Sequence, residues 1–85
     1  MKRHLFETVR DTASRDMAQI EALIRRLART ADVVDADIKH EEQIAFVSDP
    51  RDPAYPMLAR TLKARRDNLR ASIVSLRALV NPGSP

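Results

Sequence analysis

The sequence predicts an all-α fold: an antiparallel coiled-coil helical hairpin with a long helix over residues 4–47 and a shorter one over residues 57–80. Neither segment contains proline or glycine, and each carries apolar residues with heptad spacing. Pro50, Pro53 and Pro56 fall between them. Because proline lacks a backbone N–H and restricts the residue before it, residues 48–56 are expected to form the tip of the hairpin.

The composition favours aliphatic helix seams over a globular core. Residues 1–85 are long enough for a single domain, and a chain of this length buries only a thin core. Hydrophobic residues make up 44% of the chain but aromatic residues only 4%, and cysteine is absent. We therefore expect no disulfide, and we expect a second chain to complete the coiled coil, with a homodimer as the first expectation.

Each helix has two apolar series that alternate at spacings of three and four residues. In the first helix, one series is Met17, Ile24, Ala31, Ile38 and Ala45, and the other is Phe6, Ala13, Ile20, Leu27, Val34 and Glu41. In the second helix, one series is Leu62, Leu69 and Leu76, and the other is Leu58, Arg65, Ser72 and Leu79.

Folding the chain at the tip matches the two seams layer by layer and brings Glu41 and Arg65 into adjacent layers. These two are the charged members of the seams, so we predict a partly buried ion pair that fixes the register, the alternative being that both side chains extend to solvent. An acidic block at residues 32–42 would also face a basic block at residues 60–70. Exposed pairs contribute little energy, but a slipped register would lose all of them.

The tip and the helix ends have recognisable signals. Pro56 suits the first turn of the second helix, where its missing N–H needs no partner. Asn81, followed by proline and glycine, is expected to end that helix. The tip residues that we expect to matter for shape or binding are Asp49, Pro50, Tyr55, Pro56 and Met57.

The two predicted helices differ in length. At 1.5 Å per residue, the first would span about 65 Å and the second about 35 Å. Residues 4–22 would then have no partner within the chain, although one face of them is apolar. The expected partner-binding seam is Phe6, Val9, Ala13, Met17, Ile20 and Ile24. The alternative is a break near residues 30–34, where β-branched residues lower helix propensity, and a three-helix arrangement.

Residues for catalysis do not converge in the sequence. His4 and His40 lie far apart, and neither has the partners of a catalytic triad or of a zinc-protease helix. Asp37 and Glu41 could share a cation, but a solvated acidic face explains them better. Gly83 is the sole glycine, so a glycine-rich phosphate loop is excluded. We expect a protein that is not an enzyme and that needs neither cofactor nor metal.

A row of basic residues on the second helix offers the main alternative function. Their spacing places them on one side of the helix, where they could bind the phosphates of a nucleic acid. In that reading the chain is a small dimeric helical regulator, although the absence of interleaved aromatic residues and the neighbouring acidic helix argue against nucleic acid. The residues of this candidate anion-binding stripe are Lys63, Arg66, Arg70 and Arg77.

The termini give no sign of export or of membrane insertion. The basic start of the chain is followed by Glu7, Arg10 and Asp11, which interrupt the apolar region of a signal peptide. No segment approaches the length of a transmembrane helix. We expect a cytoplasmic protein, and the net charge of +3 neither requires nor excludes an anionic partner.

Several short elements resemble the central hairpin of alphaproteobacterial FliJ-type flagellar export proteins, over residues 18–78. They are Glu41-Glu42, Ser48-Asp49-Pro50, Ala54-Tyr55-Pro56 and Arg65-Arg66-Asp67-Asn68-Leu69-Arg70. The resemblance implies a noncatalytic coiled-coil adaptor of the flagellar type III export apparatus, with the export ATPase, the export gate or an export chaperone as partners. In that family the second helix continues well beyond the position of Asn81, and the shorter stem here leaves contact with the ATPase open.

Overall fold

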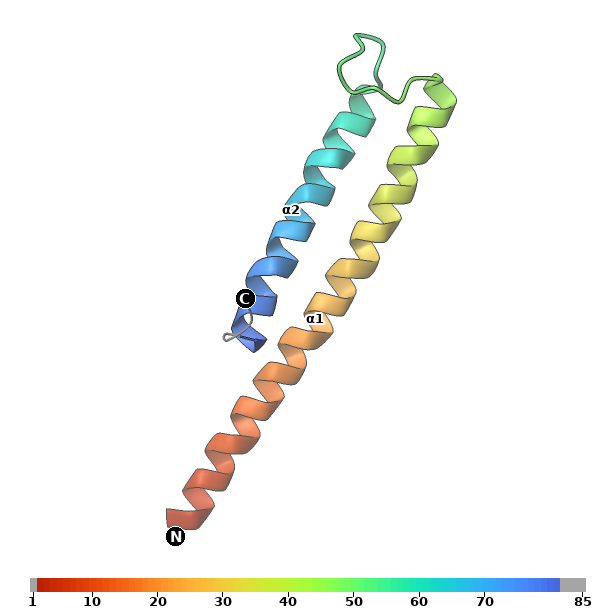
Figure 1. Ribbon diagram of the computed structural model, residues 1–85. Helices are drawn as coiled ribbons and strands as arrows, with labels where there is room; N and C mark the ends of the chain where they lie inside the picture. The colour runs from red at the N-terminus through yellow and green to blue at the C-terminus, as the bar shows by residue number, and fades with distance from the viewer. Residues whose placement is uncertain (1, 82–85) are drawn as a thin grey trace.

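The computed structural model describes the backbone of residues 2–81 and the side chains of residues 13–81. Helix α1 (Lys2–Ala45) and helix α2 (Met57–Val80) pack side by side as an antiparallel hairpin (Figure 1). The molecule measures 68 × 22 × 15 Å, so α1 accounts for its full length. The all-α hairpin is thus confirmed, and within residues 2–81 the chain forms these two helices and no strand.

Helix α1 runs without interruption through residues 30–34, so the alternative with a break and three helices is wrong. The β-branched residues there have low helix propensity, but Val34 is buried against α2. Tertiary burial outweighs a propensity difference of a few tenths of a kcal/mol. The α1 seam is as predicted, because Ile24, Ala31, Val34 and Ile38 are its buried members.

The seam of α2 differs from the prediction in one of its two series. Leu62, Leu69 and Leu76 lie partly buried, as expected. The other predicted series, Leu58, Arg65, Ser72 and Leu79, is exposed. The residues one position later face α1 instead, and they are Ala59, Arg66, Ile73 and Val80. Ala59 and Ile73 are buried, so this series gives the tighter contact with α1.

Helix α1 ends two residues earlier than predicted, at a left-handed residue. Phe46 has a φ of 56°, and its N–H donates to the carbonyl of Gln43 at 3.3 Å. The N–H of Val47 donates to the carbonyl of Glu42 at 3.2 Å. This pair of hydrogen bonds is the Schellman motif, in which glycine usually occupies the left-handed position.

The tip, residues 46–56, is held by two aspartate side chains that accept hydrogen bonds from the following backbone. Asp49 Oδ1 accepts from the N–H of Arg51 at 2.9 Å, and Asp52 Oδ1 accepts from the N–H of Ala54 at 2.8 Å. These bonds accompany two main-chain turn hydrogen bonds, from the N–H of Asp52 to the carbonyl of Asp49 and from the N–H of Tyr55 to the carbonyl of Asp52, both at 3.0 Å. Pro56 precedes the first residue of α2 with extended backbone, as its ring geometry favours.

Helix α2 ends where the sequence predicts. The C-cap is Asn81, whose N–H donates to the carbonyl of Arg77 at 2.9 Å. Within the part of the chain that the structure describes, neither helix has an apolar stretch long enough to cross a lipid bilayer.

Candidate functional site

The first candidate surface is the overhang, which we define as residues 2–22 of α1. Figure 1 shows this part of α1 continuing past the last turn of α2. Met17 is 45% exposed and Ile20 is partly exposed, although both belong to the seam that is buried further along the helix. The overhang therefore presents seam residues that α2 is too short to cover.

The predicted partner-binding seam divides into three groups in the structure. Ala13, Met17 and Ile20 lie on the overhang with accessible side chains. Ile24 is buried, so it belongs to the core of the hairpin and its assignment to the binding surface is wrong. The side chains of Phe6 and Val9 lie outside the described residues.

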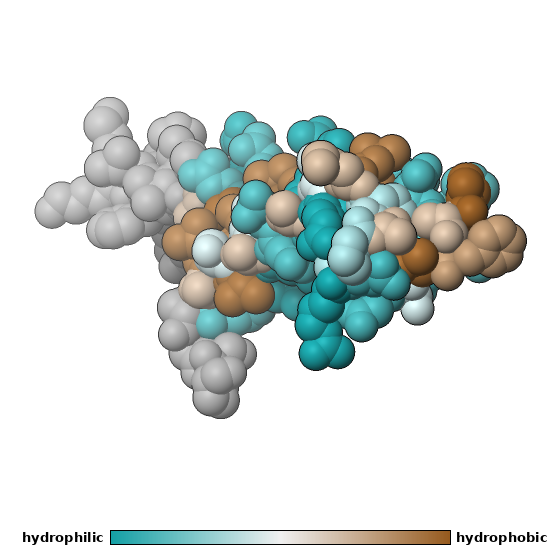
Figure 2. All heavy atoms as spheres, turned by 90° about the horizontal axis from the view of Figure 1, so that it is seen from above, coloured by the Kyte–Doolittle hydropathy of each residue, from teal (hydrophilic) through white to brown (hydrophobic). Residues whose placement is uncertain are grey.

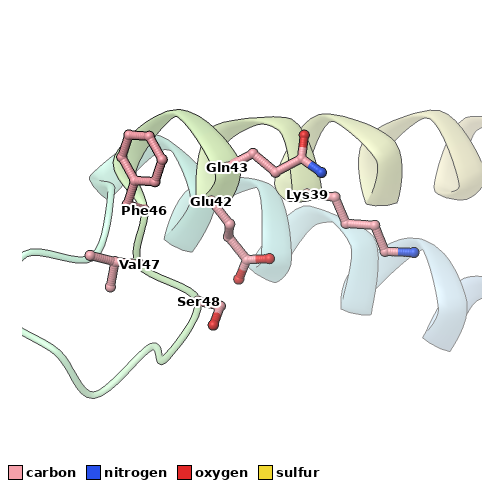
Figure 3. Close-up of a pocket in the computed structure, with 6 residues that line it drawn as sticks. All are labelled: Lys39, Glu42, Gln43, Phe46, Val47 and Ser48. Carbon is pink, nitrogen blue, oxygen red and sulfur yellow. The ribbon is translucent and has the colours of Figure 1, made fainter.

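The second candidate surface is the apolar end of the hairpin at the tip. Phe46 is 94% exposed and Met57 is 79% exposed, and Ile44 and Leu58 are also more than half exposed. Seen from the tip, a group of apolar side chains gathers over the end of α1 (Figure 2). A shallow cavity of about 490 Å³ adjoins Phe46, lined by Lys39, Glu42, Gln43, Phe46, Val47 and Ser48 (Figure 3).

Tyr55, one of the residues expected to matter for the shape of the tip or for binding, is a structural residue of the tip. Its side chain is only 4% exposed, and its hydroxyl donates to Glu42 Oε2 at 2.9 Å. Lys63 Nζ lies 3.7 Å from the same carboxylate oxygen. Lys63 and Arg60 also lie 5.2 Å and 5.3 Å from the centre of the Tyr55 ring, within cation–π range. These contacts fasten the tip to both helices.

A second polar cluster joins the helices nearer the middle of the hairpin. Arg66 Nη1 donates to Asp35 Oδ1 at 2.8 Å, and Lys39 Nζ lies 3.3 Å from Asp35 Oδ2. The hydrogen bond from Arg66 is the main reason that the pKa of Asp35 is lowered, and the bond from Lys39 acts in the same direction. The hydrogen bond with Asp35 likewise raises the pKa of Arg66. The hydrogen bond between Asp35 and Arg66 thus favours the charged form of both side chains.

The predicted ion pair between Glu41 and Arg65 does not form. Arg65 belongs to the α2 series that faces solvent, and Arg66 takes the place expected for it. The partner of Arg66 is Asp35, one turn or more from Glu41 along α1. The opposing acidic and basic blocks are nevertheless confirmed, because Asp35 with Arg66 and Glu42 with Lys63 both join α1 to α2.

The candidate anion-binding stripe is partly occupied by these internal contacts. Lys63 and Arg66 are bound to the carboxylates of α1, which neutralise them. Arg70 and Arg77 lie beside Asp32, with which they line a groove between the helices. A phosphate backbone would have to compete with these carboxylates, so the stripe is a weaker nucleic-acid surface than the sequence pattern alone indicates.

Sequence reasoning missed the most exposed aromatic residue and the strongest ion pair. The sequence predicts Phe46 inside the first helix, since it has no glycine to mark the helix end. Asp35 and Arg66 belong to the predicted charge blocks. Their individual pairing depends on which series of α2 residues faces α1, which we call the phase of α2. The one available signal for that phase is the apolar set Ala59, Ile73 and Val80.

Comparison of the chain with protein-family models, with curated proteins and with solved structures found no match.

Proposed function

We propose that this protein is a noncatalytic coiled-coil adaptor that acts in the cytoplasm and binds a protein of a flagellar or related type III export system through its overhang. The observation that carries this proposal is the mismatch in helix length. The 44 residues of α1 face only 24 residues of α2. The overhang thus keeps an exposed continuation of the same seam that packs the hairpin.

The proposed mechanism is helix-on-helix packing. A partner helix, or a pair of helices, would take the place that a longer α2 would occupy and bury Met17 and Ile20. Burying a side chain of this size contributes about 1.5–3 kcal/mol, whereas association costs about 4–15 kcal/mol, so tight binding needs contacts along the overhang in addition to those of Met17 and Ile20. The hairpin core would remain unchanged.

The assignment to an export system rests on the sequence resemblance at the tip and along α2. The candidate partners are the export ATPase, the export gate and an export chaperone. The exposed tip residues Phe46 and Met57 offer a second contact to such a partner. A helical adaptor of this kind needs no catalytic residues of its own.

The proposal is tested with purified partners and two matched double variants of the full chain. Met17→Glu with Ile20→Glu places two carboxylates on the overhang seam. Ala18→Glu with Ala22→Glu makes equivalent changes on exposed positions away from the seam. Binding to the export ATPase, to the cytoplasmic domain of the export gate and to an export chaperone is measured by calorimetry.

We expect at least one of these proteins to bind the unchanged chain, with an affinity that falls at least tenfold in the seam variant and less than threefold in the control. Far-UV circular dichroism should give the same helical content for both variants. Equal loss in the two variants, or no binding by any of the three proteins, would contradict the proposal. Salt-sensitive binding to duplex DNA without binding to these proteins would instead favour the nucleic-acid regulator.

A further inference from the structure

The two long faces of the hairpin differ in chemistry. One face carries the ion pairs of Asp35 with Arg66 and of Glu42 with Lys63. On the other side of the seam lies an open groove of about 720 Å³, lined by Leu23, Leu27, Asn68, Ala71, Ser72, Ser75 and Leu76. The lining of this groove has leucines and small polar side chains but no charged residue.

Residues seven apart lie in one column along a helix of a coiled coil, so the groove can be extended in both directions. On α1 its column is Leu23, Thr30, Asp37 and Ile44, and on α2 it is Leu58, Arg65, Ser72 and Leu79. We call the surface formed by these two columns the groove face. Ile44, Leu58 and Leu79 on it are each more than half exposed.

The two columns of the groove face match in chemistry across the hairpin. The contacts of Asp35 with Arg66 and of Glu42 with Lys63 fix the antiparallel register. In that register Leu23 lies opposite Leu79 and Ile44 opposite Leu58, so both ends of the face are apolar. Thr30 with Ser72 and Asp37 with Arg65 form the two layers between them.

This arrangement is complementary to a second copy of itself. A two-fold axis parallel to the helices places α1 of one copy on α2 of the other. Each layer of one copy then contacts the same layer of the second copy. Apolar layers then meet apolar layers, and Asp37 of each copy meets Arg65 of the second copy. A two-fold axis across the helices would instead place these charges against the hydroxyl layer. The charge pattern therefore selects the first arrangement.

The available area is sufficient for a stable dimer. The paired part of the hairpin is about 36 Å long, from the 24 residues of α2, and the molecule is 22 Å wide. The outline of such a face is at most about 800 Å², which is of the order of the accessible area that each partner contributes to a standard specific interface. The product would be a four-helix bundle in which every neighbouring pair of helices is antiparallel.

We propose that this chain forms a two-fold symmetric homodimer through the groove face, with both tips at the same end of a four-helix bundle. The groove face is separate from the overhang, so the dimer leaves two overhangs accessible at the opposite end. Dimerisation would thus give the adaptor two partner-binding seams at one end of the bundle.

The test is the mass of the full chain in solution, measured by sedimentation equilibrium between micromolar and submillimolar concentration. Leu79→Glu places a charge in an apolar layer of the groove face. Val74→Glu is the matched control on the same helix, because Val74 is 65% exposed and Leu79 is 66% exposed, and Val74 lines the groove on the ion-paired face. We expect Leu79→Glu to raise the dimer dissociation constant at least tenfold and Val74→Glu to change it less than threefold.

A charge-exchange experiment tests the arrangement within the dimer. Asp37→Arg alone and Arg65→Asp alone bring like charges together, and each should be mainly monomeric. An equimolar mixture of the two variants should form a heterodimer, because the arginine at position 37 then meets the aspartate at position 65 of the second copy and Arg65 meets Asp37. Circular dichroism on each variant checks that the hairpin is folded.

Three outcomes would overturn the inference: a wild-type chain that stays monomeric at submillimolar concentration, equal effects of Leu79→Glu and Val74→Glu, or a charge-variant mixture that stays monomeric. A dimer abolished by Met17→Glu with Ile20→Glu but not by Leu79→Glu would place the dimer interface on the overhang, and would also overturn it. The adaptor proposal is judged separately, by binding to the export proteins.

Discussion

At the scale of single residues, Phe46 is the position where the chain departs most from local preference. Its φ of 56° is left-handed, and in this region a side chain with a Cβ costs about 1–2 kcal/mol relative to the right-handed conformation. The ring is 94% exposed, so burial within the chain does not offset this cost.

We therefore expect Phe46→Gly to stabilise the isolated hairpin by about 1 kcal/mol, because glycine adopts this conformation without the steric cost. Urea unfolding followed by circular dichroism measures the change. Phe46→Ala is the control, since it removes the ring but keeps the Cβ, and it should leave the free energy of unfolding within about 0.5 kcal/mol of the unchanged chain. A glycine variant no more stable than the alanine variant would contradict this account of the helix end.

Asp35 gives the hairpin a defined response to acid. Its pKa is lowered below the ordinary value of 3.8 chiefly by the hydrogen bond from Arg66. The unfolded chain therefore binds a proton at this position more readily than the folded chain does. The resulting stabilisation is fully present above the ordinary carboxyl pKa and is lost as the pH falls from there through the lowered pKa of the folded state.

In urea unfolding at a series of pH values, Asp35→Asn should flatten the decline in stability between about pH 5 and pH 2, because the asparagine does not titrate. Asp67→Asn serves as the control, since Asp67 is more exposed and contacts Arg66 from within α2. If the free energy of unfolding declines toward acid pH as steeply in Asp35→Asn as in the unchanged chain, Asp35 is not the source of this acid response.

At the scale of the helices, the phase of α2 is the feature that the sequence left ambiguous. The α1 seam was predictable because most of the residues that flank Ile24, Val34 and Ile38 in the sequence are polar. In α2 two adjacent series each contain apolar residues and one arginine. Leucines at 58 and 79 favoured the wrong series, while the better packing of Ala59 and Ile73 decides in favour of the other.

The corrected phase has a direct test in two neighbouring residues. Ile73→Ala removes a buried side chain and should lower the free energy of unfolding by about 2–4 kcal/mol. Val74→Ala removes an exposed side chain and should change it by at most about 0.5 kcal/mol. Urea unfolding of both variants measures the difference. Comparable losses in the two would contradict the arrangement in which Ile73 faces α1 and Val74 faces solvent.

The helix boundaries and the site differ in how far the sequence could predict them. Proline and asparagine marked the start and the end of α2 correctly, because their effects on the backbone are local. The end of α1 was placed two residues too late, since the left-handed residue is a phenylalanine. The ion pair of Asp35 with Arg66 required the phase of α2, which depends on packing across the hairpin.

At the scale of the whole molecule, the unequal helices divide the chain into a paired part and the overhang. In the paired part, helix stability comes from buried side chains such as Ile38 and Ile73. The overhang has no second helix beside it (Figure 1), so its stability depends on helix propensity and on its connection to the paired part. Local unfolding should therefore begin at the overhang.

Hydrogen exchange of the full chain should reveal this division. Amides between residues 24 and 42 are expected to exchange at least tenfold more slowly than amides between residues 13 and 20, because opening the paired part breaks its contacts with α2. Mass spectrometry of exchanged peptides measures both regions in one experiment. An added partner that binds the overhang should slow exchange there. Equal protection along α1 in the free chain would contradict the division.

The hydrogen-bonded tip also bears on the order in which the hairpin assembles. Asp49 and Asp52 close their turns with residues two positions ahead, so the reversal of the chain forms from local contacts. Contacts next to a short closed loop lose the least entropy when they form. We expect pairing to spread from Tyr55 toward Asn81, with the layer of Leu23 and Leu79 closing last and reopening first.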